Sequence, residues 1–157
     1  MASPTSPRIG GYSLIKVKRA GGEETPRFEA VLVKDATPIA VVSNSGEGGS
    51  HRVRPFNGGS WEAVRTFEAF AAAWNAGTEF AGVEDGDHLV YHLLDLIANN
   101  RSRKTLFLLD DEDERTAAPR AFKGAATREE VLLELRTHFA DRNPRVWDKE
   151  AGAFIAL

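Results

Sequence analysis

The sequence predicts an α+β fold with an N-terminal antiparallel β-meander, two central helices, a β-hairpin and a C-terminal helix, with the helices mainly on one face of the sheet. Two patterns lead to this prediction. Short apolar and β-branched runs separated by turn residues fill the N-terminal third, whereas from Ser60 the apolar residues recur every three or four positions. Because strands and helices come in blocks and do not alternate, we do not expect a doubly wound parallel sheet.

Three strands are expected in the N-terminal third. Residues 14–19 are typical of a half-exposed strand, which the turn-rich residues 21–26 end. Residues 28–33 and 39–42 are apolar runs on either side of a five-residue turn, residues 34–38. This spacing is typical of a β-hairpin.

Two helices are expected in the middle of the chain. The first covers residues 60–76, with Ser60 as its N-cap, and its apolar spacing predicts that Phe67, Phe70 and Trp74 are buried. The second covers residues 87–99, where Asp87 can cap the first turn. Its apolar side chains occupy about half of the helix circumference, which indicates a helix packed against the sheet or against the first helix.

The C-terminal part combines strands with one helix. Residues 105–109 form a short apolar run between charged flanks, which fits a buried strand with residues 120–123 as its hairpin partner. Residues 127–130 form a capping box, in which the threonine and glutamate side chains each accept from the other residue's backbone amide, so a helix begins there. Residues 146–147 and 154–157 are expected to add a final strand or a packed tail.

The composition is that of an ordinary globular protein. The chain has 157 residues, of which 42% are hydrophobic and 27% charged, so we expect a single α+β domain over residues 13–157. Residues 1–12 are rich in Ser, Pro and Gly and are expected to form a mobile N-terminal arm. The absence of cysteine excludes disulfides, thiolate zinc sites, iron–sulfur clusters and a cysteine nucleophile.

The net charge of −3 conceals an asymmetry. Residues 1–57 carry eight basic and five acidic side chains, whereas residues 58–157 carry twelve and eighteen. The N-terminal third is therefore the part of the chain suited to meet an anion. No apolar run approaches the roughly 18 residues of a membrane span, and the first residues lack the apolar core of a signal peptide, so a cytoplasmic location is expected.

A glycine-rich segment, residues 43–54, is the strongest candidate site. Its three glycines allow positive φ and inward-pointing amides, the geometry of an anion-binding nest, and arginine grips phosphate or carboxylate through two hydrogen bonds. The alternative is a flexible loop with solvated arginines, because the segment lacks the Gly-Lys-Ser/Thr of a P-loop and opens no helix as a GxGxxG fingerprint does. The candidate ligand-binding residues are Ser43, Asn44, Gly46, Gly48, Gly49, Ser50, His51, Arg52 and Arg54.

These residues carry a resemblance to a known group. The strand at residues 28–33, a second strand ending in Val42-Ser43-Asn44, the Gly-Gly loop followed by Arg, and a late strand, helix and aspartate-containing turn resemble small uncharacterised proteins of phages and bacterial mobile elements. The resemblance covers about half of the chain, and Ser45 stands where that group would have an acidic residue. Because the group has no assigned activity, the resemblance implies only a small accessory protein that counteracts host defence by binding.

Two other clusters offer alternatives. His88, His92, Asp95 and Asn99 share one stripe of the second helix, opposite the leucines. The first three of these could ligate zinc or manganese, although a solvated helix face is the simpler interpretation. The acidic run Asp110–Glu114 could hold a cation or imitate a nucleic-acid backbone, but such connectors are usually only solvated.

We therefore expect a non-catalytic binding protein, forming a homo-oligomer and needing no cofactor. Its partner would be an anionic small molecule such as a nucleotide signal, or a defence protein that meets the acidic run or an exposed sheet edge. Two alternatives stay open: a metal-dependent hydrolase or nuclease that uses His88, His92 and Asp95, and a nucleic-acid-binding accessory protein.

Overall fold

A computed structural model describes residues 6–157, so the first five residues of the predicted arm lie outside the described chain. The chain divides into two compact units, of which one ends at Leu94 and the other begins at Asp95. Each unit is described separately below. Whether residues 13–157 fold as a single domain stays a prediction.

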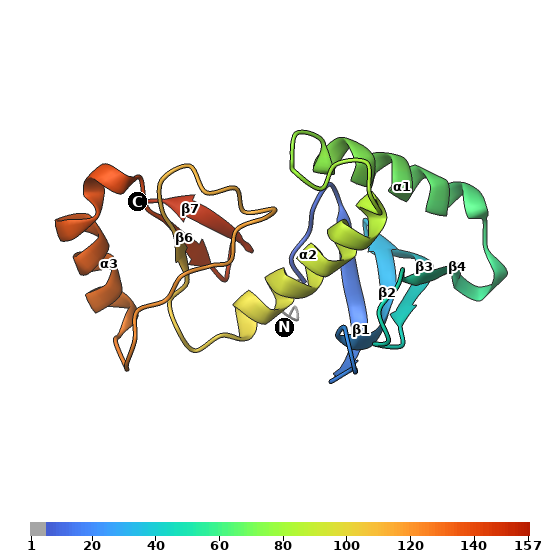
Figure 1. Cartoon of the computed structure of the whole chain (residues 1–157), viewed down its shortest axis with the longest axis horizontal. Helices are drawn as coiled ribbons and strands as arrows, with labels where there is room; N and C mark the ends of the chain where they lie inside the picture. Colours follow the sequence, from blue (N-terminus) through green and yellow to red (C-terminus); the bar gives the residue numbers. More distant parts are fainter. Residues whose placement is uncertain (1–5) are drawn as a thin grey trace. The chain divides into compact units, whose positions relative to one another are not determined.

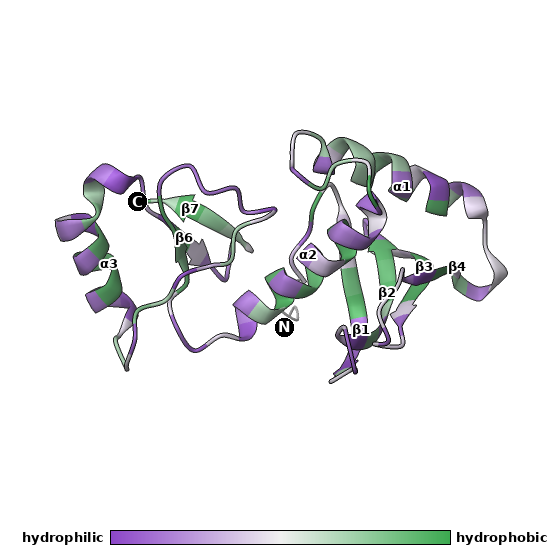
Figure 2. Cartoon of the chain, viewed as in Figure 1, coloured by the Kyte–Doolittle hydropathy of each residue, from purple (hydrophilic) through white to green (hydrophobic). Residues whose placement is uncertain are grey.

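The N-terminal unit contains the predicted meander, and the structure confirms the α+β class (Figure 1). Its antiparallel sheet has four strands in sequential order: β1 (Tyr12–Ala20), β2 (Arg27–Lys34), β3 (Thr37–Asn44) and β4 (Arg52–Pro55). Side chains that alternate along the strands form the inner face of the sheet, where Phe28, Leu32 and Val42 are buried. The hydropathy colouring shows these strands as mostly apolar (Figure 2).

The turn between β2 and β3 is shorter than predicted. The expectation of a five-residue turn over residues 34–38 was wrong, because Lys34 pairs with Thr37 and leaves only Asp35 and Ala36 between the strands. Both residues have positive φ, 47° and 70°, which matches the twist that two-residue hairpins need. No residue pair marks this turn in advance, since Asn-Gly or Asp-Gly is its usual signature and the turn here is Asp35-Ala36.

Residues 6–11 precede β1 and lie within the predicted arm. Ile9 and Tyr12 exchange two backbone hydrogen bonds of 2.9 Å, and the carbonyl of Gly11 accepts from the Asp35 amide at 2.9 Å. Gly10 lies against the Phe70 ring so closely that a Cβ there would overlap it. This stretch is therefore tied to the hairpin and to the first helix.

The first helix, α1 (Trp61–Asn75), confirms the helical prediction. Ser60 caps it by accepting a hydrogen bond from the Glu62 amide at 3.0 Å. Phe67 is fully buried, whereas Phe70 and Trp74 are only half-buried. A short 3₁₀ helix, η1 (Phe56–Gly58), joins β4 to this helix.

The second helix, α2 (Asp85–Arg101), is longer than the predicted range of residues 87–99. Asp87 lies inside its first turn and accepts the backbone amide of His51 at 3.0 Å. The simpler interpretation of the histidine stripe, a solvated face, was wrong for two of its residues, because His92 and Asn99 are buried. Trp74 from α1 covers the His92 ring at a centroid distance of 5.3 Å.

The C-terminal unit contains a three-stranded antiparallel sheet and one helix. Its elements are β5 (Phe107–Leu108), α3 (Arg128–His138), η2 (Ala140–Arg142), β6 (Arg145–Asp148) and β7 (Ala153–Ala156), with strand order β5-β6-β7. The predicted hairpin partner of the first strand is confirmed by an antiparallel bridge between Phe107 and Arg120. Thr127 caps α3 as predicted, because its hydroxyl oxygen accepts from the Glu130 amide at 3.2 Å. The second half of the predicted capping box differs: the Glu130 carboxylate accepts from the Thr127 hydroxyl at 3.2 Å instead of from the Thr127 amide.

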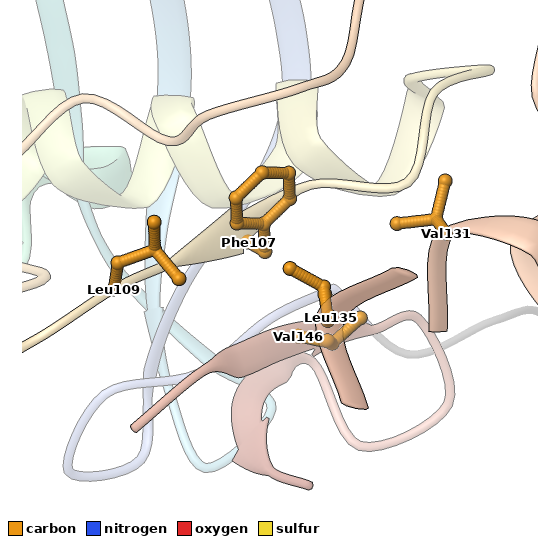
Figure 3. Close-up of a cluster of buried hydrophobic side chains, with 5 residues drawn as sticks. All are labelled: Phe107, Leu109, Val131, Leu135 and Val146. Atoms are coloured by element: carbon orange, nitrogen blue, oxygen red, sulfur yellow. The ribbon is translucent and has the colours of Figure 1, made fainter. Parts of the chain in front are cut away.

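The core of this unit joins its helix to its sheet. Side chains from β5 and the residue after it, from α3 and from β6 meet in one cluster, shown in Figure 3: Phe107, Leu109, Val131, Leu135 and Val146. Trp147 is also buried, and its indole N–H donates to Asn100 at 2.8 Å. In the chain from residue 6 onwards, no helix combines the length and apolarity that crossing a membrane requires.

Candidate anion-binding site

The register of the N-terminal sheet aligns charged side chains across its outer face. Residues that pair directly across antiparallel strands project to the same side. One such row, which crosses all four strands, consists of Lys18, Glu29, Ser43 and Arg52. The next row is Ile15, Val31, Val41 and Arg54. The outer face therefore carries a polar row beside a mostly apolar one.

The polar row lines a pocket of about 550 Å³, here called the basic pocket. Four basic and two acidic side chains surround it, so its formal charge is positive. Its lining residues are Lys18, Arg19, Ala20, Arg27, Phe28, Glu29, Ser43, Asn44, Ser45, Glu47 and Arg52. The volume lies within the range of about 300–1,000 Å³ that is typical of small-molecule sites.

The charged side chains of the basic pocket form no ion pairs with one another or with other described residues. Among residues 6–157, none of the ion pairs within 4.0 Å involves Lys18, Arg27, Glu29 or Arg52. Arginine binds carboxylate and phosphate through its planar fork, and lysine attracts them as a point charge. The pocket therefore offers donors for an anion and two carboxylates, Glu29 and Glu47, for groups that donate hydrogen bonds.

The β3–β4 loop, residues 45–51, forms one wall of the pocket and is organised by Asn44. The Oδ1 atom of Asn44 accepts from the Gly46 amide at 2.8 Å and from the Thr25 hydroxyl at 3.3 Å. Its Nδ2 atom donates to the Gly49 carbonyl at 3.1 Å and lies 3.0 Å from Nδ1 of His51. One buried side chain thus holds both ends of the loop.

Close packing explains why this loop is rich in glycine. Gly46 has a φ of 83°, and its Cα lies 2.6 Å from where a Cβ of Gly22 would stand. The Gly46 carbonyl accepts from the Glu24 amide at 2.9 Å, which fixes the loop to the β1–β2 turn. The predicted nest of free amides is therefore partly occupied, because the amides of Gly46 and His51 already donate to Asn44 and Asp87.

The predicted ligand-binding residues do not all meet at the basic pocket. Ser43, Asn44 and Arg52 line the basic pocket, whereas Arg54 occupies the neighbouring row and is not part of the lining. Ser50 and His51 instead face the start of α2, where the Ser50 hydroxyl donates to Glu84. The predicted set also contains Gly46, Gly48 and Gly49, which all have positive φ.

Sequence reasoning missed the basic residues of the first hairpin. Lys18, Arg19 and Arg27 join Arg52 at the pocket although up to 34 positions separate them along the chain. The one available signal was the excess of basic over acidic residues in the N-terminal third, which does not say which of them meet. It became informative only when the strand register placed Lys18 opposite Glu29.

The buried imidazole of His51 has an unusual environment. Its ring contacts those of Phe28 and Tyr91 at centroid distances of 4.9 and 4.5 Å. Burial lowers the pKa of His51, an effect that the nearby carboxylates of Asp87 and Glu84 partly offset. His51 is therefore neutral at neutral pH.

The alternative metal site is not assembled in the described chain. Within residues 6–157, no three His, Cys, Asp or Glu side chains come close enough together to hold a metal ion. His88 packs against Phe80 at a ring distance of 5.1 Å, and His92 packs against Trp74. His88, His92 and Asp95 share a helix without forming a common coordination sphere.

The acidic run at residues 110–114 is largely paired with arginines. Asp110 binds Arg142 at 2.6 Å, and Asp113 binds Arg115 at 2.7 Å. The Glu112 carboxylate accepts from the Leu109 amide at 2.7 Å, and it also forms an ion pair of 2.9 Å with Arg120. The hydrogen bonds from Arg142 and Arg120 lower the pKa of Asp110 and of Glu112 respectively. This segment is therefore a folded connector with few unpaired charges.

Comparison of the chain with protein families, curated proteins and solved structures finds no match.

Proposed function

We propose that this protein is a non-catalytic binding protein that holds an anionic ligand of nucleotide size in the basic pocket. One observation carries the proposal: the strand register gathers Lys18, Arg27 and Arg52 around one pocket, and none of the three has an ion-pair partner within the described chain. Charge-assisted hydrogen bonds to an anion contribute about 1.5–3 kcal/mol each.

Glu29 narrows the class of ligand. It lies between Lys18 and Ser43 in the polar row, so an anion without donors would meet its negative charge. A nucleotide supplies phosphate oxygens for the arginines and hydroxyl or amino donors for a carboxylate. This combination favours a nucleotide over an inorganic anion as the occupant.

The proposed biological setting follows from the resemblance to proteins of phages and mobile elements. A small protein that sequesters a nucleotide signal would counteract a host defence that depends on this signal. The alternative is that the acidic run at residues 110–114 binds a defence protein. The nucleotide proposal is favoured over it, because most carboxylates of this run already pair with arginines of the chain.

The test is calorimetric titration with a panel of mononucleotides, cyclic nucleotides and dinucleotides. Arg52→Ala should weaken binding by about 10-fold to 100-fold, the equivalent of one charge-assisted hydrogen bond. Arg54→Ala is the matched control, since it removes the same charge from the same face outside the pocket lining. Glu29→Gln should reduce the preference for nucleotide over pyrophosphate.

The outcomes separate a pocket from a diffuse positive surface. Equal losses in Arg52→Ala and Arg54→Ala, both abolished by salt, would indicate nonspecific attraction and contradict the proposal. Tighter binding of single-stranded oligonucleotides than of any nucleotide would favour the nucleic-acid alternative. A melting curve for each variant checks that the fold is intact.

A further inference from the structure

His51 is joined to the β3–β4 loop through one of its two ring nitrogens. Its surface is only 9% exposed, and Nδ1 lies 3.0 Å from Nδ2 of Asn44. Nε2 is buried and has no hydrogen-bond partner among the described residues. A charged imidazole would need partners for two N–H groups, and this environment provides an acceptor for neither.

The orientation of the Asn44 side chain determines the protonation state of Nδ1 of His51. The Gly46 amide can only donate, so the Asn44 atom that it meets at 2.8 Å must be the carbonyl oxygen. The amide nitrogen of Asn44 then faces His51, and Nδ1 must be an unprotonated acceptor. Protonation would place two donors against each other at 3.0 Å, and Asn44 could not rotate away without abandoning Gly46 and Gly49.

We propose that His51 is a proton-operated latch on the β3–β4 loop. When the imidazole takes up a proton, Asn44 releases the loop, and the wall of the basic pocket that contains Asn44 and Ser45 opens. This inference rests on the proposed function for its consequence, a ligand site that weakens on acidification. The latch itself depends only on the contacts of the loop.

The charged groups around His51 belong to one end of α2 and to the residue before it. Asp87 and Glu84 favour the protonated ring, whereas His88 and burial oppose it, and burial is the largest influence. The Tyr91 ring of α2 contacts His51 at 4.5 Å and is neutral here, because burial raises the pKa of its hydroxyl. Phe28 of β2 also contacts the ring, and Thr25 of the β1–β2 turn binds Asn44. The latch therefore responds below the ordinary histidine pKa of about 6.5.

The experiment follows the backbone amide signals of Gly46 and Thr25 by NMR from about pH 7.5 to about pH 5. In the wild-type chain these signals should titrate together with the His51 ring and exchange faster with solvent at the acidic end. His51→Gln keeps an acceptor near Asn44 but carries no titratable proton, so its loop signals should stay constant. His138→Gln is the control, because His138 is an exposed histidine on α3 paired with Glu134.

A loop that titrates identically in the wild type and in His51→Gln would overturn the latch, as would a loop that stays constant while His51 protonates. Binding of cyclic AMP is measured in parallel, since its phosphodiester keeps one charge over this range. Loop signals that titrate in the absence of any nucleotide binding would support the latch and contradict the proposed function. The two ideas can thus fail separately.

Discussion

Gly22 and Gly21 are neighbours in the β1–β2 turn that meet opposite surroundings. A Cβ on Gly22 would overlap the Thr25 carbonyl and stand 2.6 Å from the Cα of Gly46, whereas a Cβ on Gly21 would meet no atom within 4 Å. The β3–β4 loop therefore depends on the absence of a side chain at one of two adjacent glycines.

We predict that Gly22→Ala lowers the free energy of unfolding by about 1–3 kcal/mol, the usual cost of overpacking. Gly21→Ala should be neutral or slightly stabilising, because it reduces the freedom of the unfolded chain without a clash. Chemical denaturation of both variants measures the difference. Equal stabilities would show that the turn moves aside at no cost and that the loop is not held by close packing.

Residue-level reasoning from the sequence found part of the site. Ser43 and Arg52 were predicted because they lie in one recognisable glycine-rich segment. Lys18 and Arg27 were not, since their proximity to Arg52 depends on the register of three antiparallel strand pairs, which is a long-range property. The same limit applies to His92, whose burial depends on Trp74 from another helix.

At the scale of secondary structure, two leucines of α3 differ in burial although both lie in the same helix. Leu135 is fully buried in the core of the C-terminal unit, whereas Leu133, two positions earlier on the same helix, is 66% exposed. The two leucines therefore share backbone conformation and helix propensity but differ in packing.

We predict that Leu135→Ala destabilises the C-terminal unit by about 2–5 kcal/mol, because it leaves a cavity among Phe107, Val131 and Val146. Leu133→Ala should change stability by less than about 0.5 kcal/mol, as is usual for surface positions. Amide exchange within β6 would measure both effects. A similar loss in the two variants would contradict the helix orientation.

The order and type of elements were predictable where the signal is local. Capping residues and apolar spacing located α1 and α3, and alternation located the strands. The β2–β3 turn was missed because Asp35 and Ala36 adopt positive φ without a glycine. Positive φ at alanine has no sequence signature, because it is energetically unfavourable by itself. Only the pairing of the two strands on either side offsets this conformational cost.

At the scale of the whole molecule, stability should depend on pH through His51. A histidine whose pKa is lowered by burial takes up its proton more readily in the unfolded chain. Its neutral form therefore contributes stability that is fully present above about pH 6.5, and this contribution is lost as the pH falls towards the lowered value.

We predict that the unfolding free energy of the wild type falls relative to that of His51→Gln as the pH decreases from about 6.5 to about 5. Carboxylates away from His51 contribute equally to both proteins, so the difference reports the histidine together with its coupling to Asp87 and Glu84. Denaturant titrations at several pH values provide the measurement. A constant difference across this range would mean that His51 titrates alike in the folded and unfolded chains.

The sequential order of the four N-terminal strands also bears on how the chain acquires its structure. Each of β1 to β4 pairs with the next strand along the chain, across short connections. In contrast, β5 and β6 are separated by the whole of α3, and Phe107 must find Val146. Closing that longer loop costs more conformational entropy before strand pairing contributes any favourable free energy. We therefore expect the N-terminal meander to form first during synthesis, with the C-terminal sheet closing last.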